Sequence, residues 1–222
     1  MKKIFTILNF VFLALIVAGD VCYTIFGGLW LKALTSLMFV TLGGINLFYA
    51  IKNKTNYLKF SIWLVVGLVF AMAGDIVLNI YFIGGAILFA VGHIFFYVAY
   101  CNLAKFKWTD LIYSAIIFVP SLFILLFVPI LNYGSVLMQI VCIAYALIIS
   151  LMLGKSIANF VREKNLFTLI ILIGCALFFF SDLMLLFDVF AGAKIAGILC
   201  LATYYPAEFL LGYSIFVGSN KK

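Results

Sequence analysis

The chain has 222 residues, of which 68% are hydrophobic and only 9% are charged, with a formal net charge of +7. Roughly a quarter of the residues of a soluble domain are charged, so this composition excludes a soluble globular protein. It indicates an all-α, polytopic membrane protein. The basic residues lie in short clusters between apolar runs, as topology signals do, and we therefore expect a lipid bilayer rather than nucleic acid as the partner of the excess charge.

Eight apolar runs follow one another along the chain, each close to the 20 residues or so that a helix needs to cross a bilayer. The connections between them are short, which predicts that neighbouring helices pack as antiparallel hairpins. No stretch is polar enough for a separate soluble domain, so residues 1–222 are expected to form a single integral membrane domain. The predicted spans are Ile4–Phe26, Leu29–Ile51, Phe60–Ile80, Phe82–Cys101, Thr109–Pro129, Gly134–Leu153, Leu166–Phe187 and Lys194–Val217.

The charges between these spans predict the orientation of the bundle. With eight helices, twelve of the 14 Lys and Arg residues fall on one side, and only Lys32 and Lys194 fall on the other. Positive residues are enriched in cytoplasmic loops, so we expect both the N- and C-termini to be cytoplasmic. The predicted location is the plasma (inner) membrane of a bacterium.

Most of the seven acidic residues lie inside predicted spans. Asp110 and Glu163 lie at cytoplasmic helix boundaries, and Asp188 lies at the outer end of the seventh helix. An ionised side chain near the bilayer centre costs about 2.5–3.5 kcal/mol on insertion scales, so several in one small protein indicate function. The four acidic residues within spans are Asp20, Asp75, Asp182 and Glu208.

Three of these acids share one expected depth. Asp20, Asp75 and Asp182 each lie on a helix that runs outward, five or six residues before its predicted outer end. At the rise of an α-helix this is about 8 Å below the outer edge, so the three carboxyls are predicted to converge on one pocket. His93 and Glu208, nearer the middle of their spans, would extend that pocket inward.

Other polar side chains fall in the same helices. Asn79 follows Asp75 by four residues, and Tyr97 follows His93 by four, so each pair shares a helix face. The spacing around Tyr145 does not place it, but it is a further candidate. The polar candidates beside the acids are Asn79, His93, Tyr97, Tyr145 and Tyr205.

Two other chemistries fit these residues less well. Carboxylates and one imidazole suit Zn²⁺, but no HxxxH or HxxE spacing accompanies His93, so no metal or other cofactor is expected. A Ser–His–Asp hydrolase would use Ser181, which lacks the GxSxG elbow of such enzymes.

Several short motifs, in this order and spacing, resemble the YhhN family of membrane proteins, whose characterised members are lysoplasmalogenases. Tyr145–Met152 is also similar to the sixth-helix pattern of that family. The motifs are Gly74-Asp75-Ile76-Val77-Leu78, Gly92-His93-Ile94-Phe95-Phe96-Tyr97, Phe180-Ser181-Asp182 and Tyr204-Tyr205-Pro206-Ala207-Glu208.

The resemblance implies a lipid hydrolase that cleaves the vinyl-ether bond of a lysoplasmalogen, a lysophospholipid, to a fatty aldehyde and a glycerophospho-alcohol. Such cleavage needs one acid that protonates the double bond and one carboxylate that stabilises the cation or activates water, as in glycosidases. Asp75 and Asp182 are predicted to be this catalytic pair. The residues predicted to bind the substrate are Asn79, His93, Tyr97, Tyr145, Tyr205 and Glu208.

Two alternatives remain open from the residues alone. A proton-coupled transporter of a small or lipid-like solute also uses carboxylates within the membrane, although inverted repeats with broken helices would be expected. The chain has a faint parallel repeat instead, Ala18-Gly19-Asp20-Val21 and Ala73-Gly74-Asp75-Ile76. The second alternative is a lipid hydrolase that cleaves esters or amides.

Overall fold

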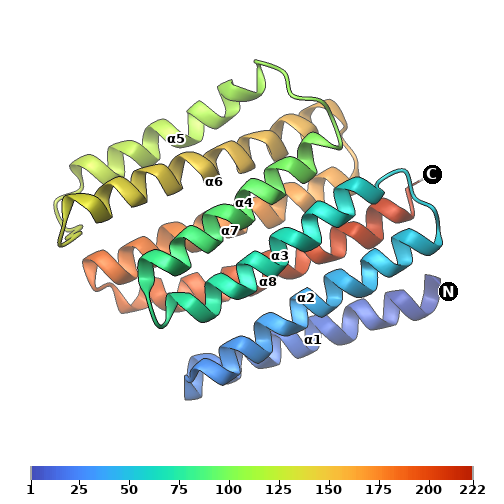
Figure 1. Cartoon of the computed structure of the whole chain (residues 1–222), viewed down its shortest axis with the longest axis horizontal. Coiled ribbons are helices and arrows are strands. Elements are labelled where there is room, and N and C mark those ends of the chain that lie inside the picture. The colour runs from blue at the N-terminus through green and yellow to red at the C-terminus, as the bar shows by residue number, and fades with distance from the viewer. Residues whose placement is uncertain (1, 222) are drawn as a thin grey trace.

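The computed structural model describes residues 2–221, which form eight helices (Figure 1). All eight are long and apolar enough to cross a membrane, which confirms the all-α, multi-pass fold. Lipid offers no hydrogen-bond partners to the backbone, so long apolar runs satisfy their N–H and C=O groups within helices. The helices are α1 (Lys2–Phe26), α2 (Leu29–Lys52), α3 (Leu58–Leu78), α4 (Phe82–Cys101), α5 (Asp110–Phe127), α6 (Val136–Arg162), α7 (Leu166–Ala191) and α8 (Lys194–Ser219).

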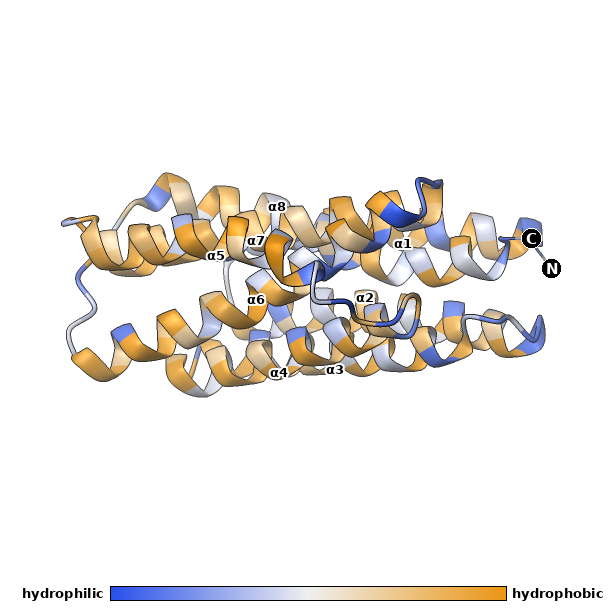
Figure 2. Ribbon diagram, turned by 90° about the horizontal axis from the view of Figure 1, so that it is seen from above, coloured by the Kyte–Doolittle hydropathy of each residue, from blue (hydrophilic) through white to orange (hydrophobic). Residues whose placement is uncertain are grey.

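The helices pack in two layers (Figure 2). In one layer α2, α3, α4 and α6 contact each other in that order, and in the other α8 lies between α1 and α7. Helix α8 also contacts α2 and α3 across the layers, and α7 contacts α6. The core therefore lies along α8. The apolar stretch of α8 has a larger share of buried residues than that of any other helix in the described chain.

Both termini lie at one end of the bundle, together with the α2–α3, α4–α5 and α6–α7 connections (Figure 1). We call this the terminal end, and the other the opposite end. At the opposite end Gly27 and Gly28 turn the chain from α1 to α2 with φ of 65° and 96°, and Gly192 caps α7 with φ of 67°. Only glycine adopts such conformations readily, and these tight turns place Lys32 and Lys194 at the opposite end.

The prediction that consecutive helices form hairpins is wrong at one place. In the described chain α4 and α5 do not contact each other, and α5 packs only on α6. The reason is that α4 is already held between α3 and α6. Helix α5 is therefore attached at the edge of the bundle by a single neighbour and by its connection to α4.

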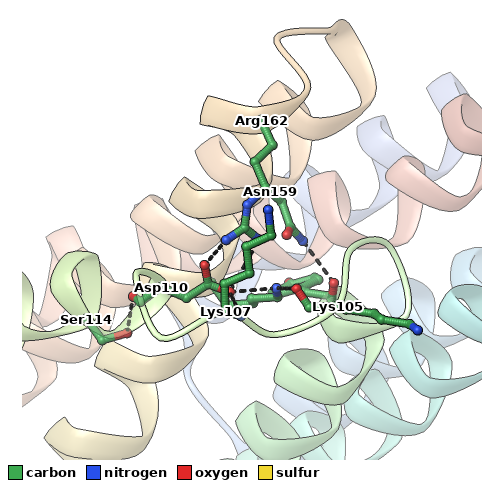
Figure 3. A network of polar contacts seen from close by, with 8 residues as sticks. Lys105, Lys107, Asp110, Ser114, Asn159 and Arg162 are labelled. Atoms are coloured by element: carbon green, nitrogen blue, oxygen red, sulfur yellow. Dashed lines mark hydrogen bonds and ion pairs between the residues drawn. The ribbon is translucent and has the colours of Figure 1, made fainter.

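A polar network at the terminal end fastens that connection (Figure 3). Asp110 accepts from the Lys155 ammonium at 2.9 Å, from the Lys107 backbone N–H at 3.1 Å and from the Arg162 guanidinium. Lys155 also donates to the Lys105 carbonyl at 3.2 Å. The network ties the start of α5 to α6.

This network corrects one sequence-based expectation. Asp110 lies at a helix boundary as expected, but we expected α6 to end at Leu153. Instead, α6 continues to Arg162, and both Asp110 and Lys155 are buried. The hydropathy pattern predicted too early an end for α6, because it counts Lys155 as a charged residue of a loop. In the structure the buried Asp110 of α5 compensates the charge of Lys155.

Candidate active site

Two adjoining cavities occupy the half of the bundle near the opposite end. The first is polar, about 530 Å³ in volume, and is lined by residues of α1, α2, α3, α4, α7 and α8. The second is an apolar slot lined mainly by α4, α5, α6 and α7. Leu78, Phe82, Phe89, Asp182 and Leu185 line both cavities, so Asp182 is the ionisable side chain at their junction.

Asp75 lies on the wall of the polar cavity. It is held by hydroxyls from two other helices, because its Oδ2 accepts hydrogen bonds from Ser36 at 2.5 Å and from Tyr204 at 2.7 Å. The ammonium of Lys32 lies 3.4 Å from its Oδ1. Both charged side chains are buried, and a buried ion pair persists only when further hydrogen bonds satisfy it. Asp75 is therefore surrounded by two hydroxyl donors and one ammonium.

Asp182 is the centre of a second polar group, contributed by α4, α6 and α7. Its Oδ2 accepts a hydrogen bond from the Tyr145 hydroxyl at 2.7 Å, and His93 Nε2 lies 3.3 Å away. The same His93 nitrogen lies 2.8 Å from the Tyr145 hydroxyl. The Asp182 side chain keeps 14% exposure, and since Tyr145 occupies Oδ2, its Oδ1 is free to meet a ligand.

The two predicted catalytic acids thus line one cavity, but the third acid of equal expected depth does not join them. Asp75 and Asp182 both line the polar cavity. Asp20 is half-buried and is not among the residues that line it. Helix α1 reaches the cavity through Tyr23 and Thr24, one turn nearer the opposite end than Asp20, so equal expected depth was not enough to place the Asp20 carboxyl there.

The residues predicted to bind substrate divide into three groups by position. Asn79 lines the polar cavity and donates to the Asp75 carbonyl at 2.6 Å, and Tyr145 lines the apolar slot. His93 is fully buried and touches Asp182 and Tyr145 without lining either cavity. It can therefore act on a ligand only through those two side chains.

The other three predicted residues lie behind the cavity walls or further along the bundle. Glu208 and Tyr205 are fully buried, and their side-chain oxygens have no hydrogen-bond partner within residues 2–221. Glu208 lies within electrostatic range of both Asp75 and Asp182. Tyr97 lies one turn beyond His93, beside Cys101, and lines neither cavity.

Sequence reasoning missed Lys32. We counted it as one of two basic residues on the less charged side, yet it is buried and paired with Asp75. A signal was present, because Lys32 lies inside the predicted span Leu29–Ile51, where an ammonium needs a partner. Ser36, four residues later, also faces Asp75, as the helical repeat requires.

Metal ligands do not gather in the described residues 2–221: no three His, Cys, Asp or Glu side chains come close enough to hold an ion together. The polar groups of the site are instead engaged with hydroxyls, one imidazole and one ammonium. This arrangement suits proton transfer between oxygen atoms and a ligand.

Comparison with known proteins gives one match. The sequence model of the YhhN family matches residues 29–215, which is most of the chain and includes Asp75 and Asp182. Asp20 lies outside the matched range. No curated protein and no solved structure matches the chain.

Proposed function

The chain belongs to the YhhN family, and on that premise we propose that it is a hydrolase within the membrane that cleaves the vinyl-ether bond of lysoplasmalogens. The products are a fatty aldehyde and a glycerophospho-alcohol. The observation that carries the proposal is the position of Asp182 where the polar cavity meets the apolar slot. A lysolipid is likewise divided into a polar part and a hydrocarbon chain, and its vinyl-ether bond lies between the two.

The reaction needs only water and proton transfers. A carboxylic acid protonates the vinyl carbon that bears the hydrocarbon chain, which leaves an oxocarbenium ion at the carbon bonded to oxygen. Water adds to that carbon as a base removes its proton. The resulting hemiacetal collapses when its hydroxyl loses a proton and the glycerol oxygen gains one. The two carboxyls then hold the same protons as before, as in glycosidases, and no cofactor takes part.

The surroundings of the two acids support different roles for them. Asp75, next to Lys32, is the carboxylate that stabilises the cation and takes the proton of water. Asp182 is the acid, with Oδ1 delivering the proton and Oδ2 held by Tyr145. General acid catalysis of this kind contributes roughly 10²–10⁴-fold. His93 and Tyr145 are positioning residues for Asp182, and Asn79 supports the cavity wall next to Asp75.

The apolar slot takes the hydrocarbon chain. Its lining includes Phe82, Phe89, Leu125 and Ile149, which offer van der Waals contact and no hydrogen-bonding groups. The chain enters from a bilayer that is equally apolar, so the fit of the chain to the slot, and not transfer from water, decides its binding. Selection among lysolipids by chain length would arise in this slot.

The orientation in the membrane is part of the proposal. The terminal end bears most of the lysines and arginines, and the positive-inside rule places it in the cytoplasm. The polar cavity then lies in the outer half of the bilayer, in a bacterial plasma membrane. Labelling of a cysteine introduced at the C-terminus from either side of sealed vesicles tests this placement.

The decisive test is an assay of purified Asp75→Asn and Asp182→Asn variants on a lysoplasmalogen. We expect turnover to fall by at least about 10²-fold in each, while Asp20→Asn, the matched control, keeps near-normal turnover. Vinyl-ether, alkyl-ether and acyl lysolipids offered side by side define the bond that is cleaved. Normal turnover in both cavity variants, or cleavage of the acyl compound alone, would reject the proposal.

A further inference from the structure

Both carboxyl oxygens of Asp75 are already engaged by neighbouring side chains. Oδ2 accepts hydrogen bonds from the hydroxyls of Ser36 at 2.5 Å and Tyr204 at 2.7 Å. Oδ1 faces the ammonium of Lys32 at 3.4 Å. Only 3% of the Asp75 side chain is exposed, against 14% for Asp182. A water molecule in the polar cavity therefore has little direct access to the carboxyl of Asp75.

The two hydroxyls that donate to Asp75 differ in their relation to the cavity. Tyr204, on α8, is among the residues that line the polar cavity, whereas Ser36, on α2, is not. The Ser36 hydroxyl also contacts the Lys32 carbonyl, one turn earlier in its own helix, at 2.9 Å. Tyr204 therefore connects the cavity to Asp75, whereas Ser36 supports the same carboxyl from outside the cavity.

The ring of Tyr204 is held by aromatic rings from three other helices, each nearly perpendicular to it. They are Phe39 on α2, Phe89 on α4 and Phe178 on α7, with ring centroids 6.2, 5.9 and 5.3 Å away. This edge-to-face packing is favourable for aromatic pairs, and it keeps the phenol beside Asp75. A phenol has one proton to donate and lone pairs that accept. Since its proton is directed to Asp75, the Tyr204 oxygen can accept from a water molecule in the cavity.

We propose that Tyr204 is a further catalytic residue, which passes the proton of the attacking water to Asp75. As the oxygen of water bonds to the cationic carbon, one water proton moves to the phenol oxygen and the phenol proton moves to Asp75 Oδ2. The phenol ends as it began, the water becomes the hemiacetal hydroxyl, and Asp75 holds the proton. The same path in reverse returns that proton to the glycerol oxygen when the hemiacetal collapses. The inference rests on the proposed function for the reaction itself.

Ser36→Ala is the matched control for Tyr204→Phe, because each variant removes one hydroxyl from the same oxygen of Asp75. If both hydroxyls only held Asp75 in place, the two variants would lose similar turnover. The relay predicts that Tyr204→Phe lowers turnover on a lysoplasmalogen by at least about 10²-fold. Ser36→Ala should lower it by less than about tenfold, as expected for the loss of one supporting hydrogen bond.

Deuterium exchange into the substrate separates slow capture of the cation from a general loss of activity. In D2O, Asp182 delivers deuterium to the vinyl carbon that bears the hydrocarbon chain. A cation that water does not capture returns a proton to Asp182, so the lysoplasmalogen is recovered with deuterium on that carbon. Mass spectrometry of the unreacted lipid should detect this exchange in Tyr204→Phe, and not in the wild-type protein or in Ser36→Ala.

The folded state of each variant is checked by its Tm in detergent and by its binding of a saturated alkyl-ether lysolipid. Phenylalanine keeps the ring contacts of Tyr204, so we expect both to be near normal. Equal losses of turnover in Tyr204→Phe and Ser36→Ala would overturn the inference. A large loss in folded Tyr204→Phe without deuterium in the recovered lipid would overturn it as well, because the defect would then precede the capture of the cation.

Failure of the relay and failure of the proposed function give different results. If the wild-type protein cleaves the vinyl ether and Tyr204→Phe behaves like Ser36→Ala, the proposed hydrolysis stands and the relay through Tyr204 is rejected. If the wild-type protein neither cleaves the vinyl ether nor exchanges its vinyl hydrogen, the proposed function is rejected and the relay with it.

Discussion

The hydroxyl of Tyr145 on α6 donates a hydrogen bond of 2.7 Å to Oδ2 of Asp182 on α7. The same hydroxyl lies 2.8 Å from Nε2 of the buried His93 on α4, so one phenol connects three helices at the junction of the two cavities. This contact restrains the rotation of the Asp182 carboxyl, and Asp182 itself lines both cavities. The proposed acid therefore depends on a residue that carries no charge itself.

Removal of that hydroxyl should reduce catalysis without unfolding the protein. In Tyr145→Phe the ring still fills its place, but Asp182 loses its fixed orientation, and a small misplacement of a reacting group can cost roughly 10²-fold in rate. We expect kcat on a lysoplasmalogen to fall by that order while KM changes little. Tyr213→Phe, on a half-buried tyrosine of α8 remote from Asp182, is the control. A normal kcat in Tyr145→Phe would remove Tyr145 from the mechanism.

Loss of the Lys32 ammonium should destabilise the bundle through Asp75. In Lys32→Met a buried carboxylate is left without its ion-pair partner, a change that typically costs about 3–5 kcal/mol. Thermal unfolding in detergent should show a lower Tm for this variant. The double variant Lys32→Met/Asp75→Asn should recover part of the loss, because no unpaired charge remains. Equal Tm values for the single and double variants would contradict the pairing.

The network at the terminal end should contribute to stability and not to catalysis. Asp110→Asn leaves the fully buried Lys155 without its carboxylate, and we expect about 3 kcal/mol of destabilisation. Its matched control is Glu163→Gln, which removes an exposed pair with Lys221 and should change stability by less than about 1 kcal/mol. Turnover per folded molecule should be normal in both variants. Reduced turnover per folded molecule in Asp110→Asn would instead indicate that the terminal end influences the candidate active site.

A larger side chain in the apolar slot should select against long hydrocarbon chains. Ala146 on α6 lines the slot, and Ala146→Phe fills space at a cost of about 1–3 kcal/mol to any ligand that needs it. We expect KM for long-chain lysoplasmalogens to rise about tenfold, by the usual conversion of free energy to affinity, and KM for short-chain ones to change less. Leu147→Phe, on the exposed side of the same helix, should leave both values unchanged. An equal rise in KM for long-chain and short-chain substrates would indicate that the hydrocarbon chain binds outside this slot.

Much of the fold followed from local pattern. Each span is a continuous apolar run, and a segment in lipid must satisfy its own backbone as a helix, so the eight helices could be identified one at a time. The fourth helix was predicted with its observed bounds, Phe82–Cys101. One error concerns a position where a distant residue compensates a charge: α6 extends past Lys155 because Asp110 on α5 neutralises it.

For the acids within the membrane, sequence and depth marked Asp20, Asp75 and Asp182 alike, because a carboxyl in an apolar span stands out whatever surrounds it. Helix pairing is a long-range property, and no hydropathy pattern contains it. Only the packing of α2 on α3 and α8 brings Lys32, Ser36 and Tyr204 to Asp75, and only the meeting of α4, α6 and α7 gives Asp182 its different surroundings. The chain alone marked the acids that lie in apolar spans, and the folded bundle gave Asp75 and Asp182 their partners.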